Sequence, residues 1–518
     1  MKKILNYNMS KIIFLFVLGA LTAFAFAPYK QIWTIFFAFP FLFHFLSIAH
    51  SKKNAFFYGW AFGFGQFVFG LHWISNAFMN QSVDLVWLVP IGIIGFPFVL
   101  AFFTGFMGLT YQYLFQKYLK HIDLRAVFCF ACVWYFFEYL RSTLFTGFPW
   151  NLMGYAFWPF ESILQTTYIY GIFGLSFLTV LWASLPYFLV KSKTNLVRIN
   201  VFLFLSMTIG GAYFYGEKRL EHNPIESLVY HPNVMLRLVQ GNIDQDFKWA
   251  PKLAYEHLKI HKDLSKSENW ENVTHIIWPE SAVPFTLNQD QNCRDALCEI
   301  IPLKGDLIVG GGRYDKDQVS DQFLRWNSIY ALNAMGEIVG YYDKQHLVPF
   351  GEYTPLKGLL PIDKLVEGGL DFSPGHTSKV LTLKNLPPFR PLVCYEVIFP
   401  DEAMDIDNRA QWFLNVTNDG WFGDSAGPYQ HLQMARMRSI ENGIPLMRVA
   451  NTGISAAIDP YGRMLQTLPY GMRGIIDTKL PKPLPYKNVY FLLWDWFFVV
   501  IRFLMFFLCL FYWKGQKK

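Results

Sequence analysis

Long apolar runs limit the folds that are open to this chain more strongly than any other feature of its sequence. A helix needs roughly 20 apolar residues to cross a bilayer core of about 30 Å. Seven such runs precede residue 216 and an eighth lies near the end of the chain, at about 11–27, 31–49, 55–79, 86–115, 123–140, 163–190, 197–215 and 489–512. The first run has no convincing cleavage site, so we interpret it as a retained helix and not as a signal peptide. The sequence therefore predicts a polytopic α-helical membrane protein with about eight spans.

Basic residues lie almost entirely on one side of these runs. With a cytoplasmic N-terminus, the segments on that side carry fourteen lysines and arginines: Lys2, Lys3, Lys11, Lys52, Lys53, Lys117, Lys120, Arg125, Lys191, Lys193, Arg198, Lys514, Lys517 and Lys518. The short loops on the other side carry only Lys30 and Arg141. The positive-inside rule then places both termini in the cytoplasm and residues 217–488 on the outer side, which in a bacterial inner membrane is the periplasm. This distribution accounts for much of the net charge of +7 without nucleic acid as a partner.

The block between the seventh and eighth runs has the composition of a soluble domain. Its length of about 270 residues is sufficient for one sizeable α/β domain. Helical segments such as 429–442 alternate with short apolar strands, predicted at 234–240, 275–278, 306–309, 328–332, 338–342, 391–393 and 412–416. We expect Gly310-Gly311-Gly312 to form a turn that ends the third strand. The chain is thus predicted to have seven helices in 1–216, a layered α/β domain in 217–488, and an eighth helix with a cytoplasmic tail in 489–518.

Three of the predicted strands end in a reactive side chain: Glu280, Lys344 and Cys394. Strand ends can converge on one edge of a sheet, where a carboxylate, an ammonium and a thiol together support acyl transfer. The thiol attacks only as a thiolate, so it needs a base, and Glu280 can serve. Lys344 and a backbone N–H after Cys394 can stabilise the oxyanion that forms. Spacing alone leaves open the alternative that Cys394 is a small buried hydrophobic residue.

The sequence around each of these residues resembles one of the three motifs of the nitrilase superfamily. The motifs are Trp278-Pro279-Glu280-Ser281, residues 343–353 and Val393-Cys394-Tyr395-Glu396. The flanking apolar runs and further blocks are similar to one membrane branch, the apolipoprotein N-acyltransferases; these blocks are residues 146–150, 239–243, 418–425 and 451–453. Two positions, Thr417 and Gly420, depart from that branch, which has Ser and Ala there. The resemblance implies a periplasmic α-β-β-α sandwich with a Glu–Lys–Cys triad.

The resemblance also implies an activity and a role for each residue of the triad. Cys394 takes an acyl chain from a phospholipid as a thioester, Glu280 is the general base, and Lys344 stabilises the tetrahedral intermediate. The acceptor is the α-amine of the diacylglyceryl-modified cysteine at the N-terminus of an apolipoprotein. Both substrates are amphiphiles held in the lipid bilayer, which explains why such an enzyme is tethered by helices. No cofactor is implied.

Further candidate residues surround the triad. Glu352 matches a second glutamate that orients the triad, and Tyr395 and Glu396 match residues beside the nucleophile. Water must be kept from a thioester, so an apolar pocket is expected. Its candidate walls are Trp249, which matches a tryptophan near the lipid entrance, together with Trp421, Phe422 and the segment 359–372, and each of these is equally compatible with ordinary core.

Two other functions are compatible with parts of the sequence. A membrane-tethered periplasmic amidase or nitrilase-type hydrolase shares the triad and differs only in using water as the acceptor. A transporter with a sensor domain requires polar, broken spans around a midplane site, and the runs contain few polar residues. No Walker loop, zinc-protease motif or dinucleotide fingerprint occurs, so no nucleotide or metal ion is implied.

The sequence leaves the roles of three pairs of residues open. Glu138 and Arg141 lie close together near an apolar run, where they are functional, placed at the membrane interface, or hydrogen-bonded between helices. Cys293 and Cys298 form either a disulfide or two free thiols. In the last run Asp495 and Arg502 are seven residues apart on one helical face, and their role is open.

Overall fold

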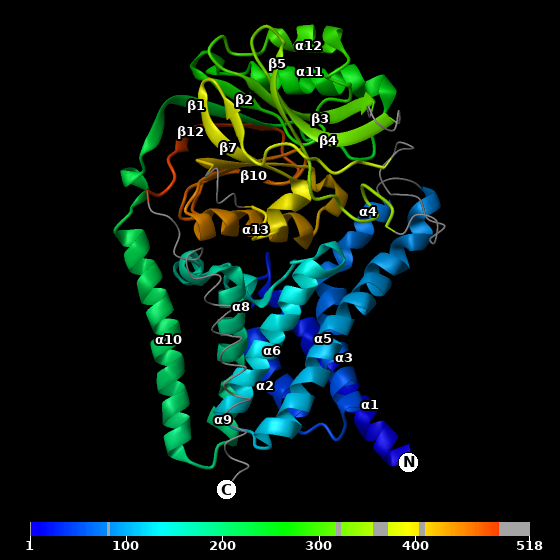
Figure 1. Cartoon of the computed structure of the whole chain (residues 1–518), viewed down its shortest axis with the longest axis vertical. Coiled ribbons are helices and arrows are strands. Elements are labelled where there is room, and N and C mark those ends of the chain that lie inside the picture. Colours follow the sequence, from blue (N-terminus) through cyan, green and yellow to red (C-terminus); the bar gives the residue numbers. More distant parts are fainter. Residues whose placement is uncertain (1, 80–82, 317–322, 356–370, 404–409, 486–518) are drawn as a thin grey trace. The chain divides into compact units, whose positions relative to one another are not determined.

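The computed structural model describes residues 2–79, 83–316, 323–355, 371–403 and 410–485. The chain divides into two compact units, whose elements are labelled in Figure 1. The helical unit contains Met1–His72 and Pro90–Asn223, and the α/β unit contains Trp73–Val89 and Pro224–Pro485. The predicted eighth span with Asp495 and Arg502, and positions 359–370 of the predicted pocket, lie outside the described residues.

Helices make up most of the helical unit, because an apolar segment in lipid can satisfy its backbone groups only within itself. Three stretches of the described chain are long and apolar enough to cross a membrane, namely Val86–Leu119, Thr167–Lys191 and Asn195–Glu221, and two shorter apolar helices are Met9–Ala25 and Trp33–Ser47. These helices support a membrane-associated protein, and the count of eight spans stays a prediction. The helices are α1 (Lys2–Thr22), α2 (Trp33–Ser47), α3 (Lys52–Leu71), α5 (Phe96–Leu114), α6 (Leu124–Thr143), α7 (Glu161–Leu164), α8 (Thr167–Ser184), α9 (Pro186–Lys191) and α10 (Asn195–Glu221).

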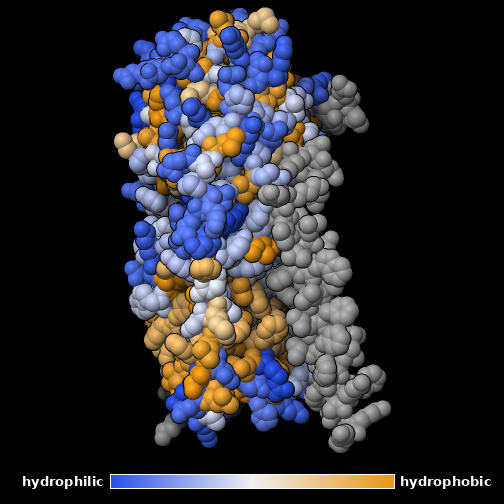
Figure 2. Space-filling model, turned by 90° about the vertical axis from the view of Figure 1, so that its left-hand side faces the viewer, coloured by the Kyte–Doolittle hydropathy of each residue, from blue (hydrophilic) through white to orange (hydrophobic). Residues whose placement is uncertain are grey.

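Glycines allow two helices of this unit to pack closely. A Cβ atom on Gly59 would lie 2.2 Å from the carbonyl oxygen of Thr104, and one on Gly63 would lie 1.9 Å from Thr104 Oγ1. Helices α3 and α5 can therefore approach this closely only with glycine at these positions. On the face that Figure 2 shows, the helical unit is mostly hydrophobic. Its exposed side chains include Phe202, Leu203, Phe204 and Met207 of α10. Such a continuous apolar surface suits contact with lipid.

Glu138 and Arg141, the buried ionisable pair in α6, bind the backbone of the segment 148–153. Glu138 accepts hydrogen bonds from the backbone N–H of Met153, at 3.0 Å, and from the hydroxyl of Ser176. Arg141 donates to two backbone carbonyls in the segment 148–150, at 2.6 and 2.8 Å. These contacts favour the structural interpretation of the pair, since each joins α6 to another part of the same unit.

Two six-stranded sheets form the α/β unit, with strand orders β12-β1-β2-β3-β4-β5 and β11-β10-β9-β8-β7-β6. The strands of the first sheet are β1 (Tyr230–Gln240), β2 (His275–Ile277), β3 (Leu307–Lys316), β4 (Phe323–Leu332), β5 (Ile338–Asp343) and β12 (Gly474–Pro481). Those of the second are β6 (Leu381–Leu383), β7 (Leu386–Val393), β8 (Trp412–Thr417), β9 (Leu446–Ala450), β10 (Ser455–Ile458) and β11 (Met464–Leu468). The helices of the unit are α4 (Asn76–Met79), α11 (Ala254–Ser265), α12 (Gln291–Cys298) and α13 (Ala426–Asn442).

The main apolar core lies between the two sheets. Leu236 of the first sheet belongs to the same buried cluster as Leu414 of the second. A second cluster lies on the other face of the first sheet and includes Leu258 of α11 and Leu297 of α12. Helix α13 packs on the second sheet, beside β9 (Figure 1). The layers therefore follow the predicted α-β-β-α order.

The prediction of a turn at Gly310-Gly311-Gly312 is wrong, because these glycines continue β3. They pair antiparallel with β4 in an unbroken register. A Cβ atom on Gly310 would lie 2.5 Å from the carbonyl oxygen of Pro279 and 2.7 Å from the Cα of Glu280. The missing side chain therefore lets the segment after β2, with Glu280, lie directly against β3.

Cys293 and Cys298 both lie in α12 and are free thiols. Cys293 is buried in the cluster on the outer face of the first sheet. The Sγ atom of Cys298 lies 3.4 Å from the backbone carbonyl oxygen of Arg294, one helical turn earlier. Of the two interpretations that the sequence left open, the structure has the unpaired one.

Candidate active site

Glu280 follows β2 and is 7% exposed. The side chain of Asn327 donates to Glu280 Oε1 at 2.8 Å and to Glu352 Oε1 at 2.9 Å, so it joins the two carboxylates. Glu280 Oε2 has no hydrogen-bond partner among the described residues. Burial raises the pKa of Glu280, while the charge of Lys344 acts against this rise. An unpartnered carboxylate oxygen with a raised pKa is suited to accept a proton.

Lys344 follows β5 and is held as an ammonium group. Its Nζ lies 2.8 Å from Glu352 Oε2, and both side chains are buried. Burial acts to lower the pKa of Lys344, but the charges of Glu352 and Glu280 outweigh burial and raise it. Glu352 also accepts a hydrogen bond from the backbone N–H of Val348 at 2.8 Å, which fixes the carboxylate. Lys344 therefore stays protonated and brings a positive charge to the site. Its ion pair with Glu352 fixes the position of the ammonium group.

Cys394 begins the turn that follows β7, and its backbone is left-handed with φ of +51°. Such a conformation costs a non-glycine residue roughly 1–3 kcal/mol and persists only where its surroundings hold it. The residue is 8% exposed. Burial, followed by the charge of Glu280, raises the pKa of the Cys394 thiol, and Lys344 opposes this rise. The thiol therefore does not ionise by itself and needs a base.

Glu396 ties the segment of the cysteine to the segment of the lysine. Its Oε1 accepts from the backbone N–H groups of residues 345 and 346 at 2.7 and 3.1 Å, and its Oε2 accepts from that of Val393 at 2.7 Å. The neighbouring ring of Tyr395 packs edge-to-face against Phe399, with centroids 5.0 Å apart. Glu396 and Tyr395 thus hold the turn that carries the thiol.

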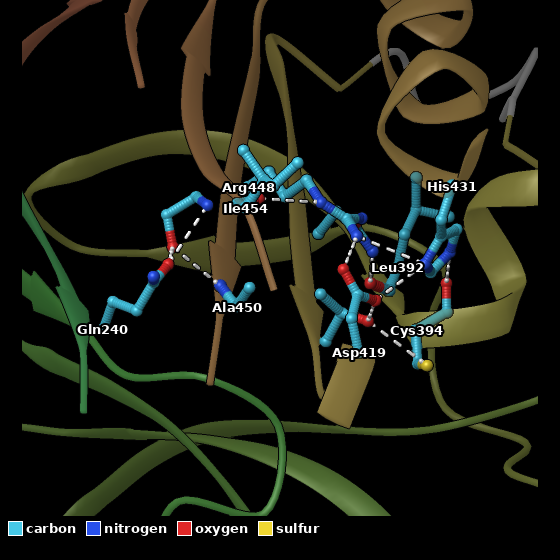
Figure 3. A network of polar contacts seen from close by, with 11 residues as sticks. Gln240, Leu392, Cys394, Asp419, His431, Arg448, Ala450 and Ile454 are labelled. Atoms are coloured by element: carbon cyan, nitrogen blue, oxygen red, sulfur yellow. Dashed lines mark hydrogen bonds and ion pairs between the residues drawn. The ribbon is translucent and has the colours of Figure 1, made fainter. Parts of the chain in front are cut away.

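A buried network of charged side chains supports Cys394 from the second sheet (Figure 3). Asp419 lies 2.6 Å from Arg448 and 2.9 Å from His431 Nδ1, and His431 Nε2 lies 3.2 Å from the backbone oxygen of Cys394. The hydroxyl of Thr417 lies 3.0 Å from Asp419 and 3.3 Å from Cys394 Sγ. Burial acts to raise the pKa of Asp419, but Arg448 and then His431 outweigh it and lower the pKa to about 2. An ionised Asp419 therefore anchors contacts to both the backbone and the thiol of Cys394.

Sequence reasoning missed this network and two further residues of the site. Arg448 offered a signal, because a charged residue in the middle of the apolar strand β9 must find a partner once it is buried. No motif marks Asn327 or Lys248. Lys248 is 5% exposed, and its Nζ donates to the backbone carbonyl of Glu280 at 3.2 Å.

Known families match both units of the chain. Residues 18–185 match the apolipoprotein N-acyltransferase N-terminal domain, and residues 236–484 match the carbon-nitrogen hydrolase family. An apolipoprotein N-acyltransferase of Rhodopseudomonas palustris is 37% identical over 500 residues, covering 93% of this chain and 91% of the relative. The chain belongs to the apolipoprotein N-acyltransferase family. Another member, from Rickettsia typhi, is 37% identical over 475 residues and covers 90% of this chain and 92% of its own.

Two solved structures are similar to about half of the chain. Nit3 of Saccharomyces cerevisiae, a nitrilase-superfamily member, matches with a TM-score of 0.35 and 20% identity over 48% of this chain and 90% of its own. An amidase from Nesterenkonia matches with a TM-score of 0.34 and 19% identity over 50% of this chain and 94% of its own. Membership of the apolipoprotein N-acyltransferase family rests on the sequence relatives and not on these structures.

The three aromatic residues predicted to line a lipid pocket lie in different surroundings in this apolipoprotein N-acyltransferase family member. Trp249 is half-buried, and the Nζ of Lys248 lies 6.0 Å from the centre of its ring. Trp421 is also half-buried. Phe422 packs against Trp73 of the segment 73–89, with ring centroids 4.7 Å apart. A role in lipid binding stays a prediction for all three.

Proposed function

We propose that this chain is an apolipoprotein N-acyltransferase that moves a fatty acyl chain from a phospholipid, through a thioester on Cys394, to the α-amine of a diacylglyceryl-cysteine. The observation that carries the proposal is the geometry of the buried site: Asn327 and Glu352 join Glu280 to Lys344. Glu396 ties the segment of Lys344 to the turn that carries the buried thiol of Cys394. Apolar helices long enough to cross a membrane, which suit substrates held in a bilayer, support it. Relatives named apolipoprotein N-acyltransferase, which match over nine-tenths of the chain, support it further.

The first half-reaction loads the enzyme. Glu280 Oε2 accepts the proton of the Cys394 thiol, and the thiolate attacks the carbonyl carbon of a phospholipid ester. The ammonium of Lys344 stabilises the oxyanion of the tetrahedral intermediate. When the intermediate collapses, the ester C–O bond breaks and Glu280 returns the proton to the departing glycerol oxygen. The products are a lysophospholipid and an acyl thioester on Cys394.

The second half-reaction forms the amide. The neutral α-amine of the acceptor attacks the thioester carbonyl, and Glu280 takes a proton from the attacking nitrogen. The C–S bond breaks, the thiolate of Cys394 departs, and Glu280 returns the proton to it. A thiolate is a better leaving group than the alkoxide of the original ester, so the thioester makes attack by an amine easier. The same base and the same cation thus serve both halves.

The proposed activity can be tested by following a labelled acyl chain through the two half-reactions. Purified full-length enzyme in detergent, mixed with phospholipid labelled in its acyl chain, should carry the label on Cys394. Adding a diacylated lipopeptide with a free α-amine should move the label to the peptide, and an N-acetylated lipopeptide is the matched control that should receive none. A label that leaves Cys394 as free fatty acid at the same rate with and without the peptide would instead support the hydrolase, which uses water as the acceptor.

The proposal places the α/β unit in the periplasm of a bacterial inner membrane, with both termini in the cytoplasm. It rests on the asymmetry of basic residues between the two sides of the apolar runs. A reporter enzyme that is active only in the periplasm should be inactive when fused after residue 518 and active when fused after residue 223. Activity of the fusion after residue 518 would contradict this topology.

A further inference from the structure

Thr417 is the last residue of β8 and lies beside the candidate nucleophile. Strand β8 runs parallel to β7, and their register pairs Val416 with Val393, the residue before Cys394. The carbonyl of Thr417 accepts a hydrogen bond at 3.0 Å from the backbone N–H of Asn451, and Thr417 is fully buried. The sheet therefore fixes the Thr417 hydroxyl next to the thiol.

The hydroxyl of Thr417 faces two acceptors. Its Oγ1 lies 3.0 Å from Asp419 Oδ1 and 3.3 Å from Cys394 Sγ. A hydroxyl carries one hydrogen, so it donates to only one of these atoms at a time. A charged acceptor binds the hydrogen more strongly than a neutral one, so the hydrogen points to the carboxylate while Cys394 is a thiol. Once Cys394 is a thiolate, rotation about the Cβ–Oγ1 bond can turn the hydrogen to Sγ without moving any heavier atom.

Asp419 keeps a partner on each oxygen when the hydroxyl turns away. Its Oδ2 accepts a hydrogen bond from Arg448 at 2.6 Å, and its Oδ1 lies 2.9 Å from His431 Nδ1 (Figure 3). A buried polar group that loses its last partner would oppose the rotation by its full cost of desolvation. That cost does not arise here, because Arg448 and His431 remain in place. The hydroxyl is therefore held in position while its hydrogen stays free to change acceptor.

We propose that Thr417 is a further catalytic residue of this active site, whose hydroxyl donates a hydrogen bond to the Cys394 thiolate in both half-reactions. The inference rests on the proposed role of Cys394 as the nucleophile. Burial is the largest influence on the pKa of the Cys394 thiol and raises it, whereas the hydrogen bond from Thr417 acts to lower it. Thr417 thus adds a neutral donor to a thiolate that Lys344 already stabilises by its charge.

Thr417 acts at the two steps in which Sγ carries negative charge. In the first half-reaction the thiol proton passes to Glu280, and the hydroxyl of Thr417 stabilises the thiolate that attacks the ester. In the second, the C–S bond breaks and its electron pair returns to Sγ, where the same hydroxyl stabilises the departing thiolate. Thr417 keeps its own proton throughout. While Cys394 carries the acyl chain, the sulfur is neutral and the hydrogen can return to Asp419.

The test measures each half-reaction separately in a set of Thr417 variants. Thr417→Val keeps the shape of the side chain and loses the hydroxyl, whereas Thr417→Ser keeps the hydroxyl and loses the methyl group. In full-length protein in detergent, single-turnover labelling of Cys394 by acyl-labelled phospholipid should be roughly 10–100-fold slower in Thr417→Val, the range for one hydrogen bond to a charged group. Transfer from the loaded variant to a diacylated lipopeptide should also be slowed. Thr417→Ser should recover most of both rates.

Thr478→Val is the matched control, because Thr478 is a buried threonine of β12 whose hydroxyl donates to the backbone carbonyl of Lys479 at 3.2 Å. Both of its rates should be native. In Thr417→Val the half-saturating concentration of phospholipid should stay native too, since Oγ1 contacts the enzyme's own sulfur and not the substrate.

A native rate of labelling in Thr417→Val overturns the inference. So does a Thr417→Ser variant as slow as Thr417→Val, because the loss would then follow the packing and not the hydroxyl. If Thr417→Val does not fold, Thr417→Ala takes its place. It differs from Thr417→Ser only by the hydroxyl, and equal rates in that pair overturn the inference. A native protein that carries no label overturns the proposed function together with the inference, which separates that result from the others, in which the native protein is labelled.

Discussion

Replacing Cys394 by alanine is expected to abolish both thioester formation and acyl transfer. In the proposed mechanism Sγ is the atom that holds the acyl chain, so the loss should reach the detection limit of the assay. The protein should still fold, because deleting one buried sulfur removes little packing and a typical single substitution costs about 1 kcal/mol of unfolding free energy. The measurement is the label retained on the protein after incubation with acyl-labelled phospholipid, with thermal unfolding followed on the same sample.

Cys293→Ala provides the matched control, because Cys293 is also a buried free thiol of the α/β unit. It should keep labelling and transfer at the native level. Acyl label on a folded Cys394→Ala protein would show that another residue carries the chain and would contradict the proposed mechanism.

Replacing Glu280 by glutamine should slow thioester formation by roughly 10²–10⁴-fold, the usual cost of losing a general base. Glutamine keeps the shape of the side chain but cannot accept the thiol proton. The native enzyme should also lose activity as the pH falls through the pKa of Glu280, which burial raises above its ordinary value of 4.5, because the carboxylate then takes up a proton. The glutamine variant should lack this acid limb. Single-turnover labelling of Cys394 over a series of pH values measures both effects.

Glu299→Gln is the control for this substitution, since Glu299 is an exposed glutamate whose side chain is 56% accessible. Its rate and pH profile should be native. A native rate of thioester formation in Glu280→Gln would show that Glu280 is not the base, and a retained acid limb in that variant would assign the limb to another group.

The charges of the site explain how a buried thiol can act as a nucleophile. Burial raises the pKa of both Cys394 and Glu280, so the acid and the base are both disfavoured in their charged forms. Transfer of the proton from the thiol to Glu280 moves negative charge from one residue to the other without adding any. The cation Lys344 is near enough to act on both residues, and it offsets the cost of the one negative charge that remains. Proton transfer between the two residues therefore adds no charge to the buried site, and Lys344 stabilises the negative charge on either residue.

Local sequence patterns were enough to predict a layered α/β unit and to place three reactive residues at strand ends within it. The alternation of side chains along a short strand and the turn residues after it are local signals, so Glu280, Lys344 and Cys394 could be assigned to strand ends. The apolar runs predicted helices for a similar reason, because in lipid an apolar segment that crosses alone can satisfy its backbone only as a helix. The length of each helix was harder to predict. Three of the described helices are long and apolar enough to cross a membrane.

Which polar side chains complete the site depends on how the elements pack together. Lys248 is 32 residues from Glu280, Asn327 is 47 residues from it, and Asp419 is 29 residues from Arg448. No local pattern links such pairs, since they meet only when the two sheets stack and neighbouring strand ends come together. The continuation of β3 through Gly310 also depends on a tertiary contact. The segment that carries Glu280 lies so close to β3 that only glycine fits there. Periodicity along the chain encodes helices and strands. Contacts between these elements depend on the packing of the whole unit. The partners of the reactive residues come from such contacts and could not be predicted from local patterns.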